Sequence, residues 1–230
     1  MRIDAHHSFS DRYPLDYLGT ILKRNRFEGS VLIAPQLIAV PPFVRGIVIE
    51  CDLADPLLPH LLDEAQRHSI FKGVCHRFTD EIPAGLIELE HRGIPLDAVT
   101  TPGLIPRVME RFPSLRVVID HLGTGDLAPD QWAYDLAQAA QSDRVFCKLS
   151  AVAGLPRVYV QHALNVFGPR RLMFGSDWPN GLPGTSWKAS LAAFTQAIGA
   201  QTIEVREELL GGSAQRFYGL AESPGDTGMS

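Results

Sequence analysis

The chain has 230 residues, of which 45% are hydrophobic and 20% are charged, a composition typical of a globular domain. Its net charge of −5, without any basic block, argues against a nucleic-acid partner. It has no apolar run of about 18 or more residues, and its N-terminus, MRIDAHHSFS, has neither the apolar segment nor the cleavage site of a signal peptide. We therefore expect a cytoplasmic protein that does not span a membrane.

Short β-branched runs alternate with helical segments along the whole chain. The predicted strands cover residues 2–6, 30–34, 45–51, 71–76, 95–100, 116–121, 144–149 and 171–176. Most of these runs are continuously apolar, as in parallel strands that are covered on both faces.

Helix-start and helix-stop residues punctuate the segments between the strands. Proline-containing starts lie at Asp55-Pro56, Thr101-Pro102, Pro129-Asp130 and Leu155-Pro156, and glycine stops lie at Gly93 and Gly168. The segment PQLIAVPPFV, between residues 34 and 45, is too short for a crossover helix and predicts a loop or a single turn. Residues 186–199 and 204–218 are expected to supply the eighth helix and one more.

This rhythm predicts an α/β fold, a shortened (β/α)8 barrel over residues 1–220 with an extra C-terminal helix. The polar tail, residues 221–230, is expected to be flexible. An open, doubly wound sheet is the alternative, but the first strand is not followed by the phosphate-binding glycine turn common in such folds.

Titratable residues gather where the predicted strands end, which in a barrel is the face that carries active sites. The strand ends read His6-His7-Ser8, Cys75-His76-Arg77, Asp120-His121, Lys148 to Ser150, and Ser176-Asp177-Trp178. Because side chains alternate along a strand, His6 and Ser8 share one face and His7 takes the other. We expect His6 to face the barrel mouth and His7 to be a structural histidine.

The same alternation separates other neighbours. Asp120 is expected to face the helices when His121 faces the mouth, and Asp4 shares the face of His6 one step deeper, as a secondary candidate.

Cys51, Cys75 and Cys147 lie in or at the end of apolar runs. An odd number without a C-x-x-C pair predicts buried, reduced thiols. The alternative is a nucleophilic Cys75 activated by the adjacent His76.

The segments IDAHHSF, GVCHRF, VVIDHLG, CKLSAV and RLMFGSDWP, in this order, resemble the amidohydrolase-2 family. Within it they are most similar to the branch of sugar-lactone and pyrone-dicarboxylate lactonases, and LGGSAQRFYGL resembles the family's C-terminal helix. The resemblance extends over about residues 2–220, and RLMFGSDWP and VVIDHLG are its most specific parts. It implies a distorted (β/α)8 barrel that hydrolyses a lactone or an amide-like carbonyl, with catalytic groups on the first, fourth, sixth and eighth strands.

One departure from the family bears on metal binding. The first strand of the family usually ends in H-x-H, the pair that binds a divalent metal in metal-dependent members, whereas here Ser8 replaces the second histidine. A serine hydroxyl is a weak metal ligand, and the lactonase branch includes metal-free members. We therefore expect no required cofactor. If a divalent metal such as zinc binds, its ligands would be His6, His121 and Asp177.

The predicted mechanism is metal-independent opening of a lactone. Asp177 would act as general base on water, while His6 and His121 polarise the carbonyl group. His76 would bind the substrate or assist proton transfer. Further contacts to substrate are expected from Arg77, Lys148, Ser8 and Trp178.

Two other functions remain open at this point. The same residues can catalyse decarboxylation, dehydration or cyclisation by proton transfer, and an inactive barrel can serve as a binding protein. The presence of His6, His76, His121 and Asp177 at matching strand ends argues against the inactive barrel. The expected partner is a small-molecule lactone or carboxylate. A homodimer is possible through the apolar segment IAVPPFV, which is otherwise packed against its own barrel.

Overall fold

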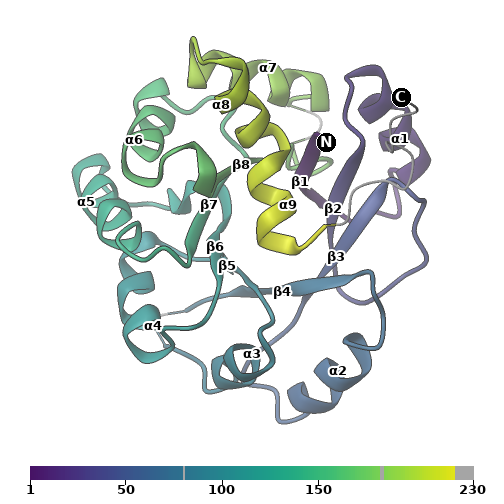
Figure 1. Ribbon diagram of the computed structural model, residues 1–230, viewed down its shortest axis with the longest axis vertical. Coiled ribbons are helices and arrows are strands. Elements are labelled where there is room, and N and C mark those ends of the chain that lie inside the picture. The colour runs from purple at the N-terminus through teal and green to yellow at the C-terminus, as the bar shows by residue number, and fades with distance from the viewer. Residues whose placement is uncertain (80, 182–183, 221–230) are drawn as a thin grey trace, which may run out of the picture.

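Eight parallel strands, paired in chain order, form the centre of the molecule in a computed structural model that describes residues 1–79, 81–181 and 184–220. The strands are β1 Ile3–Ser8, β2 Gly29–Ala34, β3 Val44–Glu50, β4 Phe71–Arg77, β5 Leu96–Val99, β6 Val117–Ile119, β7 Val145–Leu149 and β8 Leu172–Phe174. Backbone bonds beyond the end of β8 close the ring: Asp177 N donates to His6 O over 2.9 Å and Ser8 N to Trp178 O over 2.8 Å. The predicted (β/α)8 barrel is confirmed (Figure 1).

Helices surround the strands (Figure 1). They are α1 Leu15–Arg24, α2 Leu58–Ala65, α3 Leu86–Arg92, α4 Ile105–Arg111, α5 Pro129–Ala139, α6 Arg157–Phe167, α7 Trp187–Ile198, α8 Ile203–Glu207 and α9 Ser213–Tyr218. A 3-10 turn, Pro102–Leu104, leads into α4, and a π turn, Glu208–Gly212, joins α8 to α9. No helix among the described residues is long and apolar enough to span a membrane.

Two features of the helices bear on the sequence predictions. Helix α2 begins at Leu58, two residues later than the Asp55-Pro56 start suggests, because the Asp55 carboxylate accepts the Leu57 N–H in a turn that precedes the helix. No helix lies between β2 and β3, as the three prolines there predict. The apolar side chains of this loop pack against the barrel's own β2 and β3 residues, so they are used within the chain.

Side chains divide cleanly between the inside of the barrel and its outer face. Ile3, Val31, Val48, Val118 and Met173 form one buried cluster inside the ring. The residues between them on the same strands pack outward against the helices. This division shows which strand positions point into the barrel and which do not.

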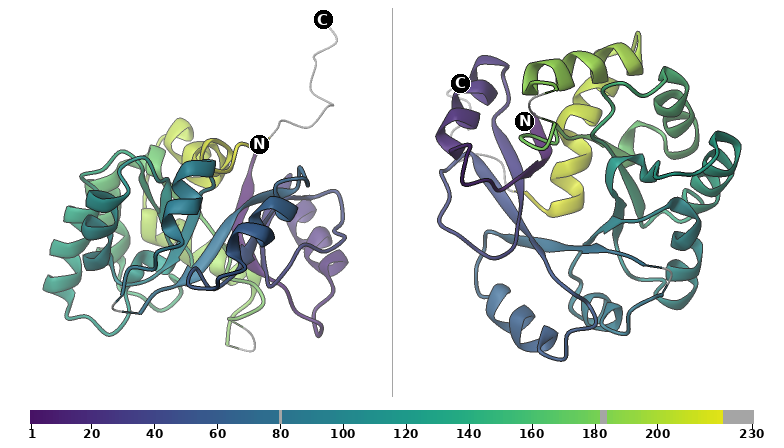
Figure 2. Two further views of the ribbon diagram at one scale, coloured as in Figure 1. Left: turned by 90° about the horizontal axis from the view of Figure 1, so that it is seen from below. Right: turned by 180° about the vertical axis from the view of Figure 1, so that it is seen from behind.

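The C-terminal segment covers the N-terminal end of the barrel. Phe217 and Tyr218 belong to the interior cluster, and Gln215 donates a side-chain hydrogen bond of 2.8 Å to Met1 O. A Cβ on Gly211 would lie 2.1 Å from Met1 O, so this close approach requires glycine. Figure 1 shows α9 lying across this end, and the right-hand view of Figure 2 shows the opposite end. The opposite end, where the strands lead into their loops, is therefore the barrel mouth. The predicted tail, residues 221–230, lies outside the described residues.

Candidate active site

An irregularity in β1 decides how its two histidines point. The pairing of β1 with β2 shifts register between Asp4 and His7, which is the signature of a β-bulge. Ala5 and His6 therefore both contact the barrel interior, whereas His7 turns outward, where its Nε2 lies 3.0 Å from the Ser30 hydroxyl. Burial lowers the pKa of His7 to about 3, so it is a neutral structural histidine. His6 was expected inside and His7 outside, and both positions are confirmed.

Three predicted residues meet at the mouth: His6, His121 and Asp177, which we call the mouth cluster. One ligand-type atom from each lies within 4.8 Å of the others. His6 Nε2 is 3.8 Å from Asp177 Oδ1, and the two imidazoles pack edge to face with ring centroids 4.6 Å apart. The cluster comes from β1 and from the segments directly after β6 and β8, so residues far apart in sequence are joined by barrel closure.

Left-handed backbone conformations place two members of the mouth cluster. His121 has φ 52° and Asp177 has φ 56°, a region that is rare for residues other than glycine. Strands β6 and β8 end before these turns, at Ile119 and Phe174, which is earlier than the predicted strands 116–121 and 171–176. Strained backbone of this kind is common at functional sites, and here it directs both side chains over the mouth.

Asp177 is held by its neighbours rather than by packing alone. Asn180 donates from Nδ2 to Asp177 Oδ1 over 3.1 Å and to Ser8 Oγ over 2.9 Å. The Asp177 side chain retains 17% of its exposure, enough to meet a water or a substrate. Gly175 makes room nearby, since a Cβ there would lie 2.6 Å from His6 Cβ.

A fully buried ion-pair network lies next to His6. Lys148 Nζ contacts Asp97 Oδ2 at 2.5 Å, Asp120 Oδ1 at 2.9 Å and His6 Nδ1 at 3.0 Å. The Tyr218 hydroxyl, from α9, donates to Asp97 at 2.8 Å. Burial alone would lower the pKa of Lys148, but Asp120 and Asp97 outweigh it and raise the pKa above its usual value. Burial, followed by Lys148 and His121, lowers the pKa of His6 well below its usual value, so the network holds an ammonium ion beside a neutral imidazole.

This network corrects two sequence predictions. Asp120 was expected to face the helices, but its carboxylate lies inside the barrel, 2.9 Å from Lys148 Nζ and 3.6 Å from His6 Nδ1. The alternation from His121 fails because the left-handed turn comes between the two side chains. Lys148 was expected to hold a substrate group, but it has 0% exposure and its ammonium is engaged by three protein acceptors. Its position suits a role in orienting His6.

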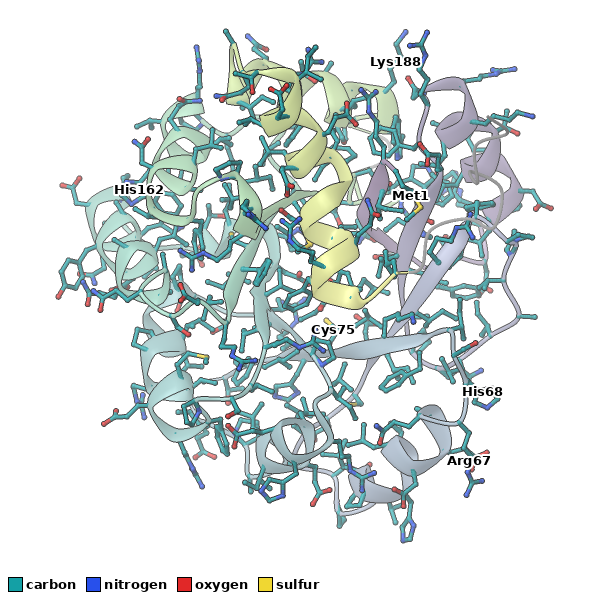
Figure 3. The ribbon with its side chains drawn as sticks, viewed as in Figure 1. Met1, Arg67, His68, Cys75, His162 and Lys188 are labelled. Carbon is teal, nitrogen blue, oxygen red and sulfur yellow. The ribbon has the colours of Figure 1, made fainter. Side chains whose placement is uncertain are left out.

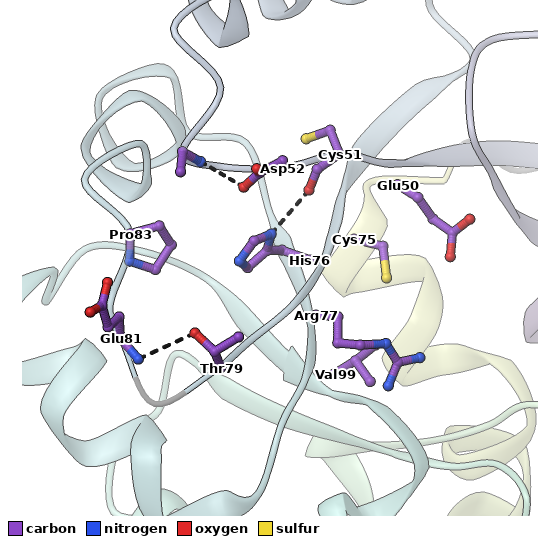
Figure 4. A pocket seen from close by; sticks show the side chains of 11 residues that line it. Glu50, Cys51, Asp52, Cys75, His76, Arg77, Thr79, Glu81, Pro83 and Val99 are labelled. Carbon is purple, nitrogen blue, oxygen red and sulfur yellow. Dashed lines mark hydrogen bonds between the residues drawn. The ribbon is translucent and has the colours of Figure 1, made fainter.

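Strand β4 turns His76, for which a catalytic role was predicted, away from the barrel interior. Cys75 packs with the interior cluster, so Arg77, two residues on, points to the same side, whereas His76 shares the outward face of Val74. Figure 4 shows His76 directed toward Asp52 and Pro83, with Cys75 and Arg77 on the other side of the strand. His76 Nδ1 lies 3.0 Å from Cys51 O. His76 therefore stands apart from the mouth cluster, and its catalytic role stays a prediction.

Two adjoining cavities open beside the mouth cluster. One of about 590 Å³ has Glu50, Asp52, His76, Arg77 and Glu81 in its wall. The other, of about 410 Å³, reaches Asp120 and His121. Arg77, Thr79 and Val99 line both, so a bound molecule can extend from His121 toward β3 and β4.

The alternative of a nucleophilic Cys75 does not fit the structure. Cys75 lies near the barrel axis beside α9 (Figure 3), and burial, then Asp120 and Asp97, raise the pKa of its thiol well above the usual value. His76 is on the opposite face of the strand and cannot take its proton directly.

Two further candidates lie away from the mouth. Trp178 is 3% exposed and packs edge to face against Tyr13, so its position does not support substrate contact. Asp4 points outward between the inward Ile3 and Ala5, and it accepts hydrogen bonds from Ser176 N at 2.8 Å and Trp187 Nε1 at 2.7 Å. The β-bulge that follows it separates its face from that of His6. Burial, opposed by the hydrogen bonds from Ser176, raises the pKa of Asp4 to about 6. Asp4 ties β1 to the segment after β8.

Some site residues gave weak signals in the sequence. Asp97 interrupts the apolar run PLDAVT, and a buried carboxylate of this kind needs a cation, which Lys148 provides. Asn180 follows Asp177 by three residues, the spacing of a turn, while Tyr218 contacts Asp97 only through the fold.

Comparison with known proteins shows the family to which the chain belongs. A family profile described as amidohydrolase matches residues 84–220, more than half of the chain. The chain belongs to the amidohydrolase family. It is therefore a hydrolase by family, and the resemblance drawn from the strand-end segments is confirmed.

Two curated relatives of this amidohydrolase match most of its length. An L-fucono-1,5-lactonase of Burkholderia ambifaria is 34% identical over 217 residues, covering 80% of this chain and 73% of that protein. An uncharacterised protein, y4mH, of Sinorhizobium fredii is 26% identical over 208 residues, covering 76% of this chain and 70% of that protein. The lactonase is thus the relative with a named activity in this pair.

Solved structures share the barrel. An amidohydrolase of Burkholderia multivorans, crystallised with HEPES and also with zinc, aligns with a TM-score of 0.81 at 24% identity, covering 96% of this chain and all of that one. A putative 2-pyrone-4,6-dicarboxylic acid hydrolase of Pseudomonas putida aligns with a TM-score of 0.73 at 22% identity, covering 96% of this chain and 98% of that one. At these identities the likeness shows the fold.

Proposed function

We propose that this amidohydrolase opens a lactone ring without a metal ion, with Asp177 as general base. The observation that carries the proposal is the mouth cluster, in which the Asp177 carboxylate lies 3.8 Å from Nε2 of a neutral, buried histidine, His6. The named activity of the B. ambifaria relative, L-fucono-1,5-lactonase, supports the choice of a lactone.

The reaction uses the groups of the mouth cluster in order. Asp177 takes a proton from water as the water oxygen attacks the lactone carbonyl carbon. His6 and His121 donate hydrogen bonds from Nε2 to the carbonyl oxygen, which becomes negatively charged in the tetrahedral intermediate. The carbonyl re-forms as the ring C–O bond breaks, and the proton held by Asp177 passes to the departing ring oxygen. The product is a hydroxy acid.

The position of His121 suits this role. Its Nδ1 lies 2.8 Å from the Ser150 hydroxyl, which fixes the ring and leaves Nε2 for the substrate. Ser150 therefore supports His121 as Lys148 supports His6, and both donors are oriented before the substrate arrives.

The same three residues are the candidate ligands for a zinc ion, which the B. multivorans structure contains. Their separations suit an open three-ligand site. The donor chemistry does not fit, because Ser8 replaces a second histidine and a lysine ammonium, not an acceptor, lies 3.0 Å from His6 Nδ1. We therefore derive no step through a metal.

The charge of the cavity wall favours a neutral, hydroxyl-bearing lactone. The wall of the larger cavity carries three carboxylates, from Glu50, Asp52 and Glu81. Among the residues that the structure describes, Arg77 is the only arginine or lysine in this wall. Carboxylates accept hydrogen bonds from sugar hydroxyls and repel a substrate with two carboxylates. We propose a sugar lactone rather than a pyrone dicarboxylate as substrate.

The decisive experiment offers L-fucono-1,5-lactone, other aldonolactones and 2-pyrone-4,6-dicarboxylate to enzyme treated with a chelator, and follows the pH drop as acid is released. We expect turnover of a neutral sugar lactone and full activity after chelation. Stoichiometric zinc that the chelator removes with loss of activity, and that restores activity when added back, would overturn the metal-free mechanism. If no lactone is opened, the non-hydrolytic alternatives, decarboxylation, dehydration or cyclisation, replace hydrolysis.

A further inference from the structure

The two nitrogens of His6 have different neighbours. Nδ1 lies 3.0 Å from Lys148 Nζ and 3.6 Å from Asp120 Oδ2, whereas Nε2 lies 3.8 Å from Asp177 Oδ1. A neutral imidazole carries one proton, and the neighbour of one nitrogen determines which nitrogen holds it.

The contacts of Lys148 determine which nitrogen of His6 carries the proton. Its ammonium group has three N–H donors and no acceptor, and three acceptors surround it: Asp97 Oδ2, Asp120 Oδ1 and His6 Nδ1, at 2.5, 2.9 and 3.0 Å. Lys148 is fully buried, and its ammonium group hydrogen-bonds to Asp97 Oδ2 and to His6 Nδ1 and forms an ion pair with Asp120 Oδ1. His6 Nδ1 must then accept a hydrogen bond, which places the imidazole proton on Nε2.

We propose that Lys148 is a positioning residue that holds His6 as the Nε2–H tautomer and thereby commits the mouth cluster to polarising a carbonyl group instead of binding a metal ion. The inference deepens the proposed function and rests on it for the identity of the carbonyl substrate. The tautomer itself follows from the contacts of Lys148 alone.

The exclusion of metal follows from the position of the proton. A metal-binding nitrogen must present a lone pair, and a protonated Nε2 presents a donor. Metal-binding histidines usually donate their other N–H to a carboxylate or carbonyl. Asp120 Oδ2, 3.6 Å from His6 Nδ1, is placed to be such an acceptor, and neither Asp120 oxygen has a well-aligned hydrogen bond within the described part of the chain. Asp120 could therefore accept the Nδ1–H of the tautomer that metal binding through Nε2 requires, but the Lys148 ammonium disfavours that tautomer.

The test removes the ammonium while keeping the buried charge balanced. The double variant Lys148→Met with Asp97→Asn deletes one positive and one negative charge and leaves Asp120 in place. Asp97→Asn alone is the matched control, because it keeps Lys148 and its contact with His6. His6→Gln identifies the His6 signals by their loss.

The first measurement is a long-range nitrogen–proton NMR spectrum of the histidine rings at one fixed neutral pH. We expect Nε2–H at His6 in the wild type and in Asp97→Asn, and Nδ1–H in the double variant, where Asp120 becomes the acceptor. An Nδ1–H tautomer in the wild type, or an unchanged Nε2–H tautomer in the double variant, would overturn the inference. The wild-type spectrum tests the tautomer even if the double variant does not fold.

The second measurement is zinc affinity, by competition with a chromophoric chelator. Changes in groups that orient metal-binding histidines typically alter affinity by about 10- to 100-fold. We expect the double variant to bind zinc at least about tenfold more tightly than Asp97→Asn, and equal affinities would count against the inference. Neither readout requires turnover, so a failure of lactone hydrolysis with the expected tautomers would reject the reaction and leave the role of Lys148 standing.

Discussion

The two sides of the barrel mouth are built differently. On the side of β1, β6 and β8, partners fix the polar groups: Asn180 holds Asp177, Ser150 holds His121 and Lys148 holds His6. On the side of β3 and β4, the cavity wall carries exposed groups, and Arg77 makes no hydrogen bond or ion pair within the described residues. A rigid half beside an open half suits a division between bond breaking and substrate selection.

The largest expected effect tests the rigid side. Asp177→Asn removes the general base and should lower kcat on the true lactone by about 10³-fold, with the fold retained by circular dichroism. Asp143→Asn, which changes an exposed carboxylate just before β7 at the other end of the barrel, is the matched control and should leave kcat unchanged. A wild-type rate in Asp177→Asn would move the chemistry away from the mouth cluster.

An intermediate effect is expected on the open side. Arg77→Met removes a cation that lines both cavities without touching the mouth cluster, so KM should rise about tenfold while kcat stays within about twofold, which is the pattern for a lost binding contact. His76→Gln is expected to change KM in the same direction. Steady-state kinetics of both variants, with the exposed Arg67→Met as control, would measure the split. A large loss of kcat in either variant would contradict the proposed division between bond breaking on one side of the mouth and substrate selection on the other.

The smallest effect concerns stability behind the rigid side. The pKa of His7 is about 3 in the folded chain and about 6.5 when unfolded, so between these values the unfolded chain binds the extra proton. The free energy of unfolding should therefore fall as pH is lowered from about 6.5, by on the order of 1 kcal/mol per pH unit from this residue.

His6, whose pKa is also lowered, contributes to stability in the same sense, so the test compares slopes. Urea unfolding between pH 7 and 5 should give a shallower pH dependence for His7→Gln than for the wild type. Identical slopes would mean that His7 is not held neutral by the fold.

The sequence predicted the barrel because eight apolar runs and their helix signals follow a regular rhythm, and such patterns arise locally. It predicted the mouth cluster because strand ends of a barrel meet at one face. It was wrong where the backbone departs from a regular strand. Asp120 lies inside the barrel because the left-handed turn at His121 separates the two side chains, and the bulge in β1 puts His6 on a different face from Asp4. In β4, Val74 and Cys75 are both apolar, so their residue types do not show which of them faces the barrel interior. Nothing in KGVCHR therefore indicated that His76 turns outward.

The hydrogen bond from Tyr218 to Asp97 spans 121 residues of sequence and closes the buried network that orients His6. During synthesis, every strand has been made before this tyrosine appears. Until then Asp97 and Lys148 face each other in a barrel whose N-terminal end is uncovered. The mouth end of the molecule is thus completed last, by a residue at the opposite end of the barrel, and a chain that stops short of α9 would carry the whole mouth cluster without its finished support.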